Sequence, residues 1–439
     1  MARGNVYMTD TDGNIGSTVT SDVEKVCGLL FDISAQTDFW TTDQGENAAA
    51  SLKDTVVEIN SLADAEALGI TPYTESTDAS AAKALLAGIP YYHIQQFFGM
   101  AGGSGRLFIA FADCSKSWNT IIDMQRASGG IISQFGVWTE QCIWKNMDTS
   151  ANQYSIAIVG DLESVAEQMA NDYFSPSYIL LCGNSAKVQT ASGKEDKVTF
   201  SKIADAIIDA RYVSVLLSQS MDTQVKKMQA SLTSTTPVGV VGLALGALTQ
   251  ASVGESIGWV QKFDLVNYVP AIEMGFGDSA VSNSEITNAT AYSALTKYQI
   301  DELDEKGYIF LCTYEGNEGH VYFTKDRSCS DGDYCTIARN RTINKSRRLV
   351  RTALLPYVNS PVKVASGGNL TAAQATVYTN LISGALEGMA TAEEISQVGT
   401  ISVPLAQNIL QTKTLTFSYT LIPNGCAEVI KVTDGLATA

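Results

Sequence analysis

The chain has few side chains suited to acid–base or metal chemistry. Its 439 residues include only two histidines, His93 and His320. Histidine titrates near neutral pH and is a common zinc ligand, so its scarcity argues against both kinds of site. His93 lies among Tyr92, Ile94 and Phe97 in a helix-like stretch. That setting predicts a packed core residue rather than a catalyst.

The eight cysteines are spread along the chain, and most lie in apolar, strand-like stretches. This pattern predicts reduced, buried thiols in a cytosolic protein, and the polar start of the sequence predicts no secretory signal. Cys329 and Cys335 are the one pair close together in sequence. We expect two loop thiols there, with a loop disulfide or half a metal site as alternatives.

No phosphate-binding motif is present in the sequence. Gly193-Lys194 lacks the upstream glycine of a phosphate loop, and the glycine-rich segment 99–105 precedes an expected strand instead of following one. We therefore expect no nucleotide, metal or other cofactor.

A few polar residues follow expected strands. In a doubly wound sheet, ligands bind beyond the carboxyl ends of the strands, where this chain carries Asp113, Asp161 and Gly183-Asn184-Ser185. Each of these can equally cap a helix or make a turn. An α/β enzyme with a site near Asp113 and Asp161 is thus an alternative, although we expect the protein not to be an enzyme.

Positive charge is concentrated in one segment of an acidic chain. The formal net charge is −17, yet residues 334–386 contain no carboxylate. The cations of this segment are Arg339, Arg341, Lys345, Arg347, Arg348, Arg351 and Lys363. Because the chain as a whole repels nucleic acid, the segment predicts contact with another protein, with a second copy, or with the chain's own carboxylates.

Short apolar strands alternate with helix-like segments in the first half of the chain. Strands are expected at 26–33, 106–111, 130–138, 154–159, 178–182 and 212–217, and helices at 80–98, 118–127, 162–172 and 201–210. This alternation predicts an α/β domain, a doubly wound and mostly parallel sheet. The apolar run 237–248 is too short to span a membrane and predicts a buried, tightly packed segment.

An α+β domain is expected after the polar stretch 275–288. Its expected elements are a hairpin at 308–324, a basic helix at 344–355, a helix beginning at Thr371, and strands at 414–421 and 426–433. The basic helix has an apolar stripe formed by Ile343, Val350, Leu354 and Tyr357. The stripe predicts docking on the subunit's own core, so the cations are expected to face outward.

Several segments together resemble contractile tail sheath proteins, as found in phage tails and related injection machines. They are 27–31 (CGLLF), 59–65 (INSLADA), 93–98 (HIQQFF), 107–109, 339–343 (RNRTI), 355–358 (LPYV) and 423–425. The middle segments 239–246 and 256–260 are similar to a prophage-encoded, sheath-like branch. The resemblance covers most of the chain, and the order and spacing of the segments carry it.

The resemblance implies a structural subunit of a contractile tail sheath. Such subunits stack as hexameric rings around an inner tube and contract to drive the tube through a target envelope. The implied partners are further copies of the chain, the inner tail tube protein, and the baseplate and tail terminator proteins, with no direct nucleic acid and no membrane. The implied place is a virion tail or a cytoplasmic contractile particle assembled in bacterial cytoplasm. A non-contractile assembly protein is a further alternative.

The resemblance also implies roles along the chain. It implies an N-terminal arm at 1–20, an outer α/β domain at 21–275, an inner α+β sheath domain at 289–425 and a C-terminal arm at 426–439. The expected arm strand, which adds to a neighbour's sheet, comprises Glu428, Val429, Ile430, Lys431 and Val432. The residues expected to contact the tube or a neighbour are Arg341, Lys345, Arg347, Arg348 and Arg351.

Overall fold

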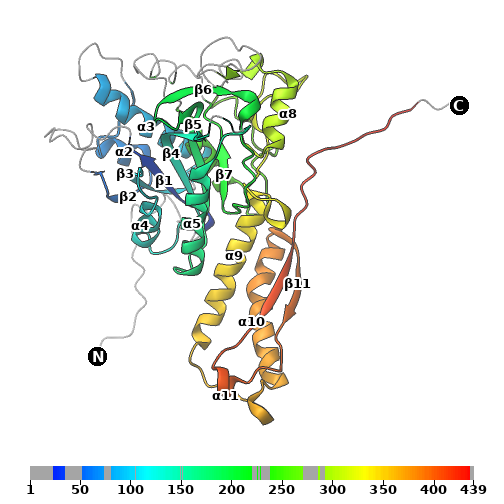
Figure 1. Ribbon diagram of the computed structural model, residues 1–439. Helices are drawn as coiled ribbons and strands as arrows, with labels where there is room; N and C mark the ends of the chain where they lie inside the picture. The colour runs from blue at the N-terminus through cyan, green and yellow to red at the C-terminus, as the bar shows by residue number, and fades with distance from the viewer. Residues whose placement is uncertain are drawn as a thin grey trace, which may run out of the picture.

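The computed structural model shows an α/β body from which an elongated C-terminal unit and an extended C-terminal segment project (Figure 1). It describes residues 23–34, 52–73, 81–103, 105–148, 150, 152–219, 225, 228, 238–269, 285–286 and 292–435. The N-terminal arm predicted at 1–20 lies outside these residues.

An eight-stranded sheet forms the centre of the body within the described residues. Its middle is parallel, in the order β3 (Arg106–Ala112), β1 (Val26–Asp32), β4 (Gln134–Asn146), β5 (Tyr178–Thr190) and β7 (Val213–Leu216). Antiparallel strands flank it: β2 (Val56–Ile59) beside β3, and β6 (Glu195–Thr199) and β8 (Glu285–Ile286) beyond β5. The predicted mainly parallel sheet is confirmed.

Helices cover both faces of this sheet. Alternate residues of β1 face opposite cores, Leu29 and Phe31 one and Leu30 the other. The first core contains α3 (Ala81–Ala101) and α7 (Val241–Gln250), and the second contains α4 (Thr120–Ala127) and α5 (Ala157–Asn171). The short α2 (Leu62–Ala67) and α8 (Lys297–Glu305) also belong to the body. Because both faces are buried, β1 and β3 and the first halves of β4 and β5 are mostly apolar.

Helices α7 and α3 pack with their backbones in close contact. A Cβ added at Gly242 would lie 2.0 Å from the carbonyl oxygen of His93, and one at Gly246 would lie 2.8 Å from that of Phe97. His93 is fully buried against aromatic rings, and this burial lowers its pKa to about 3. The predictions of a packed His93 and of a buried segment are confirmed, the latter for residues 238–248.

The C-terminal unit has a small core of its own. Its elements are α9 (Ile337–Leu354), α10 (Ala372–Thr391), β11 (Ile395–Ser402), α11 (Ile409–Thr412) and β12 (Ser418–Pro423). Strands β11 and β12 pair antiparallel, and their apolar side chains pack on α9 and α10. The Thr371 hydroxyl accepts the Gln374 N–H at 3.3 Å, as expected for the first turn of α10. No helix among the described residues is long and apolar enough to span a membrane.

Two predicted elements are wrong, and a third has no partner strand within the described residues of the single chain. Residues 154–159 are not a strand, because Ile158 and Val159 belong to the buried face of α5. Residues 201–210 form no helix beyond one 3-10 turn (Phe200–Lys202); the Ala206 N–H, for example, bonds to Lys306. Residues 426–433 run without strand pairing in this structure.

The predicted hairpin belongs with the body. Its strands β9 (Leu311–Cys312) and β10 (Tyr322–Phe323) are short, and their side chains pack into the two cores of the sheet. The hairpin is expected in the α+β domain at 289–425, but its side chains contact the body instead. Its apolar residues fill the body because Ile309 bonds to β7 through its backbone.

We expect Gly242→Ala to destabilise the protein, because the new methyl group overlaps the His93 carbonyl. The free energy of unfolding should fall by about 1–3 kcal/mol, as for overpacked cores. Gly160→Ala in α5 is the matched control, since nothing lies within 4 Å of its added Cβ. The control should be neutral or slightly stabilising in urea unfolding. Equal midpoints for both variants would contradict the close contact.

Candidate assembly surfaces

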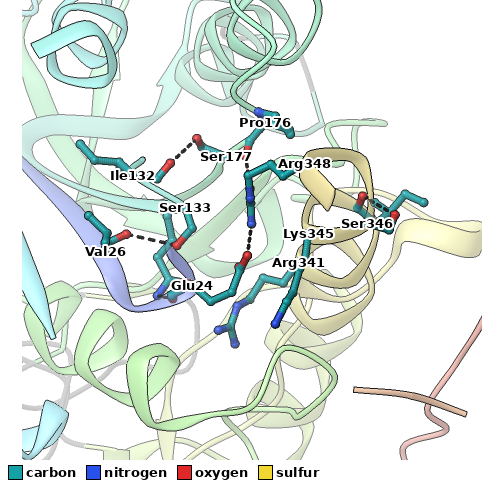
Figure 2. A network of polar contacts seen from close by, with 12 residues as sticks. Glu24, Val26, Ile132, Ser133, Pro176, Ser177, Arg341, Lys345, Ser346 and Arg348 are labelled. Carbon is teal, nitrogen blue, oxygen red and sulfur yellow. Dashed lines mark hydrogen bonds and ion pairs between the residues drawn. The ribbon is translucent and has the colours of Figure 1, made fainter. Parts of the chain in front are cut away.

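Helix α9 crosses the edge of the sheet where the parallel strands begin. Arg348 donates to the carbonyl of Pro176 at 2.7 Å and forms an ion pair with Glu24. Pro176 precedes β5 and Glu24 precedes β1. Figure 2 shows the Arg348 guanidinium between these two groups. One side chain thus joins α9 to the starts of two strands.

Two further cations of α9 contact the same edge. Arg347 donates to the hydroxyl of Tyr212 at 2.7 Å, directly before β7. The Arg351 guanidinium lies over the ring of Phe174, 4.0 Å from its centroid. Arg351 is exposed, whereas Arg347 and Arg348 are half-buried.

Arg341 is the deepest of these cations, with 3% of its surface exposed. Its guanidinium donates to the carbonyls of Leu248 at 2.9 Å, Ser252 at 3.3 Å and Ala251 at 3.4 Å. These are the last carbonyls of α7 and the residues that follow it. A cation at this position satisfies orphan carbonyls and complements the helix dipole.

Lys345 binds within the C-terminal unit. Its ammonium lies 2.5 Å from the carboxylate of Glu394, directly before β11. The expectation that the cations face outward is therefore wrong for Arg341, Lys345 and Arg348. They lie along one helix as predicted, but they bind partners in this chain. A contact between the five cations and a tube or neighbour stays a prediction.

The carboxyl edge of the sheet is filled by side-chain hydrogen bonds. Asp32, at the end of β1, is buried. It accepts from Thr139 at 2.6 Å, from Gln141 at 2.7 Å, and from the backbone N–H groups of Ser34 and Cys114 at 3.0 Å each. Strand β1 pairs with β3 on one side and β4 on the other, so this is the topological switch point, where α/β folds bind ligands. In this chain, hydrogen-bond donors of the protein itself occupy the Asp32 carboxylate.

The polar residues predicted for this edge do not come together. Asp113 is exposed and accepts the Ser115 N–H at 3.0 Å, while Asp161 lies on the exposed side of α5. Asn184 and Ser185 lie inside β5, and the Ser185 hydroxyl is 2.6 Å from that of Ser218. The structure thus gives these residues turn or core roles. Among the described residues, no group of three or more His, Cys, Asp or Glu could hold a metal.

The C-terminal segment is extended and leads away from the body (Figure 1). Val429, Ile430 and Val432 are 72%, 81% and 83% exposed. Its root is held: Asn424 donates to the Glu393 carbonyl at 2.7 Å, and Glu428 lies 3.5 Å from Lys325. The freely projecting part therefore begins after Glu428, later than the predicted start at residue 426.

The sequence alone did not identify the partners of α9. Glu24, Pro176 and Glu394 bind its cations, yet none of them belongs to a recognisable motif. A weak signal existed for Glu24, since a carboxylate directly before a buried strand needs a partner.

Two family models match almost the whole chain: the DUF2586 N-terminal domain at residues 4–327 and the DUF2586 C-terminal domain at residues 333–439. No curated protein matches the sequence at a significant level.

Solved structures share the whole fold. A chain of the anti-feeding prophage baseplate, 6-fold symmetrised, is 14% identical with a TM-score of 0.54, and the match covers 100% of both chains. A chain of the contracted PVC sheath complex, an extracellular contractile injection system, is 9% identical with a TM-score of 0.54, covering 99% of this chain and 98% of that chain. The contracted anti-feeding prophage baseplate gives 10% identity and a TM-score of 0.52. The predicted resemblance to sheath proteins is confirmed at the level of the fold.

Arg348→Met should destabilise the subunit strongly, because it leaves the Glu24 carboxylate buried without its cation. Removing one partner of a buried pair costs about 3–5 kcal/mol of unfolding free energy. Adding Glu24→Gln should recover part of this loss. Lys363→Met, at an exposed cation of the same basic segment, should change the value by less than about 0.5 kcal/mol. Urea unfolding measures all three, and equal losses for Arg348→Met and Lys363→Met would exclude the edge contact.

Glu163 makes stability depend on pH. It accepts the N–H groups of Arg211 at 3.1 Å and Tyr212 at 2.8 Å, and burial raises its pKa from 4.5 to about 7. Between these values the folded chain holds a proton that the unfolded chain has lost, so this group's contribution is complete below pH 4.5 and is lost as the pH rises through 7. The change is at most about 3 kcal/mol.

We therefore expect the wild type to lose more stability than Glu163→Gln between pH 5 and pH 8. Asp161→Asn, on the exposed side of the same helix, should follow the wild-type profile. Urea unfolding at both pH values tests this. Parallel profiles for wild type and Glu163→Gln would show that Glu163 has an ordinary pKa.

Proposed function

This chain belongs to the DUF2586 family, and from that family and its fold we propose that it is a structural subunit of a contractile tail sheath. The observation that carries the proposal is the match of the whole fold, body and C-terminal unit together, to a chain of a sheath complex. In this proposal the subunits form hexameric rings around an inner tube and contract to drive it forward. No nucleotide is needed, because contraction shifts the lattice from one packing to a more stable one.

The C-terminal arm is the proposed link between subunits. The two-stranded sheet of β11 and β12 has unpaired edges among the described residues, and residues 429–435 are extended and pair with no strand there. Ile430 and Val432 alternate with Lys431, which suits a strand with one face buried on a sheet. We propose that residues 429–432 of one subunit add to the β11–β12 sheet of a neighbour.

We further propose that the division between the two functional parts lies just before α9. The doubly wound body would then face outward, and the unit from α9 to β12 would face the tube. The inner tube, baseplate and terminator proteins are the proposed partners, and the assembled particle is a virion tail or cytoplasmic contractile particle. Of the five predicted contact cations, Arg351 suits an intermolecular contact best, because it is exposed.

Self-assembly tests the proposed function. The purified full chain at high concentration should form tubes or rings in negative-stain images. Discrete particles of one subunit under all salt and concentration conditions would overturn the proposal.

Deletion of residues 429–439 should abolish tube formation and leave the thermal unfolding midpoint unchanged. Residues 429–435 project from the described part of the chain, and the deletion leaves the Lys325–Glu428 ion pair in place. Deletion of 433–439 alone is the matched control, and it should still assemble. A large drop in the midpoint for the longer deletion would show that the arm folds on its own subunit.

A further inference from the structure

Two thiols that are far apart in the sequence line one small cavity. Six of the eight cysteines are buried, and Cys335 and Cys426 are the accessible ones. Both lie in the wall of a cavity of about 70 Å³ between the start of α9, the loop at Gly254 and the root of the arm. This volume holds about two water molecules, so the space that both thiols line is small. The cysteine nearest to Cys335 in sequence, Cys329, is fully buried.

The surroundings of the two thiols differ. Arg339 donates to the Cys335 sulfur at 3.3 Å, so a cation lies directly beside this thiol. At Cys426, burial and then the carboxylates of Asp326 and Glu428 raise the pKa. Lys325 is the cation next to Glu428, and Asp304 is its other partner. These environments suit Cys335 for attack and Cys426 for resolution.

Both cysteines lie outside regular secondary structure. Residues 424–427 have no regular structure and are held at their ends by the Asn424 hydrogen bond and the Glu428 ion pair. Cys335 directly precedes Thr336, which caps the 18-residue helix α9. A disulfide between the two cysteines would therefore involve no residue of a helix or strand.

We propose that Cys335 and Cys426 form a redox-sensitive pair that closes a disulfide between the start of α9 and the root of the C-terminal arm. The oxidant class is a small-molecule disulfide such as oxidised glutathione. The Cys335 thiolate attacks one of its sulfurs and releases one small thiol. The Cys426 sulfur, giving its proton to water, then displaces the second small thiol. Two protein thiols are oxidised, and one small disulfide is reduced to two thiols.

The bond would fix the direction in which the arm leaves the subunit. This consequence rests on the proposed function, because only an arm that exchanges between subunits is affected by such a lock. Oxidised subunits should then assemble more slowly than reduced ones. The disulfide itself is a property of the single subunit and is measured without assembly.

The test treats the folded full chain with oxidised glutathione, counts free thiols and maps tryptic peptides without reduction. We expect the loss of two thiols per chain and a link between peptide 328–339, which holds Cys335, and peptide 414–431, which holds Cys426. Because peptide 328–339 also contains Cys329, the Cys335→Ser variant is essential, and it should lose the link. Cys426→Ser should lose it too. Wild-type circular dichroism and unfolding midpoints for both variants confirm that they fold.

Three outcomes would overturn the inference: glutathione adducts on both thiols without a link, a link that survives Cys335→Ser, or a link that joins two chains. If oxidised glutathione produces no disulfide and the same chain still forms tubes, this inference is overturned and the proposed function stands. A mapped disulfide in a chain that never forms tubes would support this inference and overturn the proposed function.

Discussion

The arrangement of the two parts of the molecule depends on the buried charge contacts that α9 makes with the amino-terminal edge of the sheet. Parallel strands all begin at the same edge, so one helix that crosses it can contact several of them. Arg348 does this for β1 and β5 at once, through Glu24 and the Pro176 carbonyl. A buried ion pair adds little net stability compared with apolar packing, but it tolerates few geometries, because each unpaired charge is costly. The contact therefore defines where the C-terminal unit sits.

The same helix is connected to the core of the body. Arg341 binds the carbonyls at the end of α7, and α7 packs against α3 through Gly242 and Gly246 with no room for a side chain. Dense packing of this kind transmits displacement, since neither helix can shift without a clash. A force on the C-terminal unit is thus carried through α9 and α7 into the sheet. The C-terminal unit is thereby connected to the sheet through two packed helices.

Local sequence patterns predicted most of the fold but not the partners of the basic helix. Strands β1, β3, β5 and β7 were predictable because their apolar runs are short and bounded by polar residues. The strand predicted at 154–159 is wrong because its apolar residues Ile158 and Val159 fit a buried helix face equally well. The cations of α9 were predicted from the sequence, but the groups that their side chains contact were not. Arg348 and Glu24 are 324 residues apart in sequence, and only the folded topology brings them together.

The tip of the C-terminal arm differs from the contacts of α9, because its apolar side chains are exposed instead of packed. Most native strand edges carry charges or are covered, because an exposed apolar strand pairs with other chains. Val429, Ile430 and Val432 are instead left in water by a subunit whose cores are complete without them. Burying one such side chain contributes about 1.5–3 kcal/mol. Since the described fold does not use this free energy, it remains available for association with another molecule. In the assembly proposed above, a held arm root with an exposed apolar tip would separate the stability of the folded chain from the stability of the assembly.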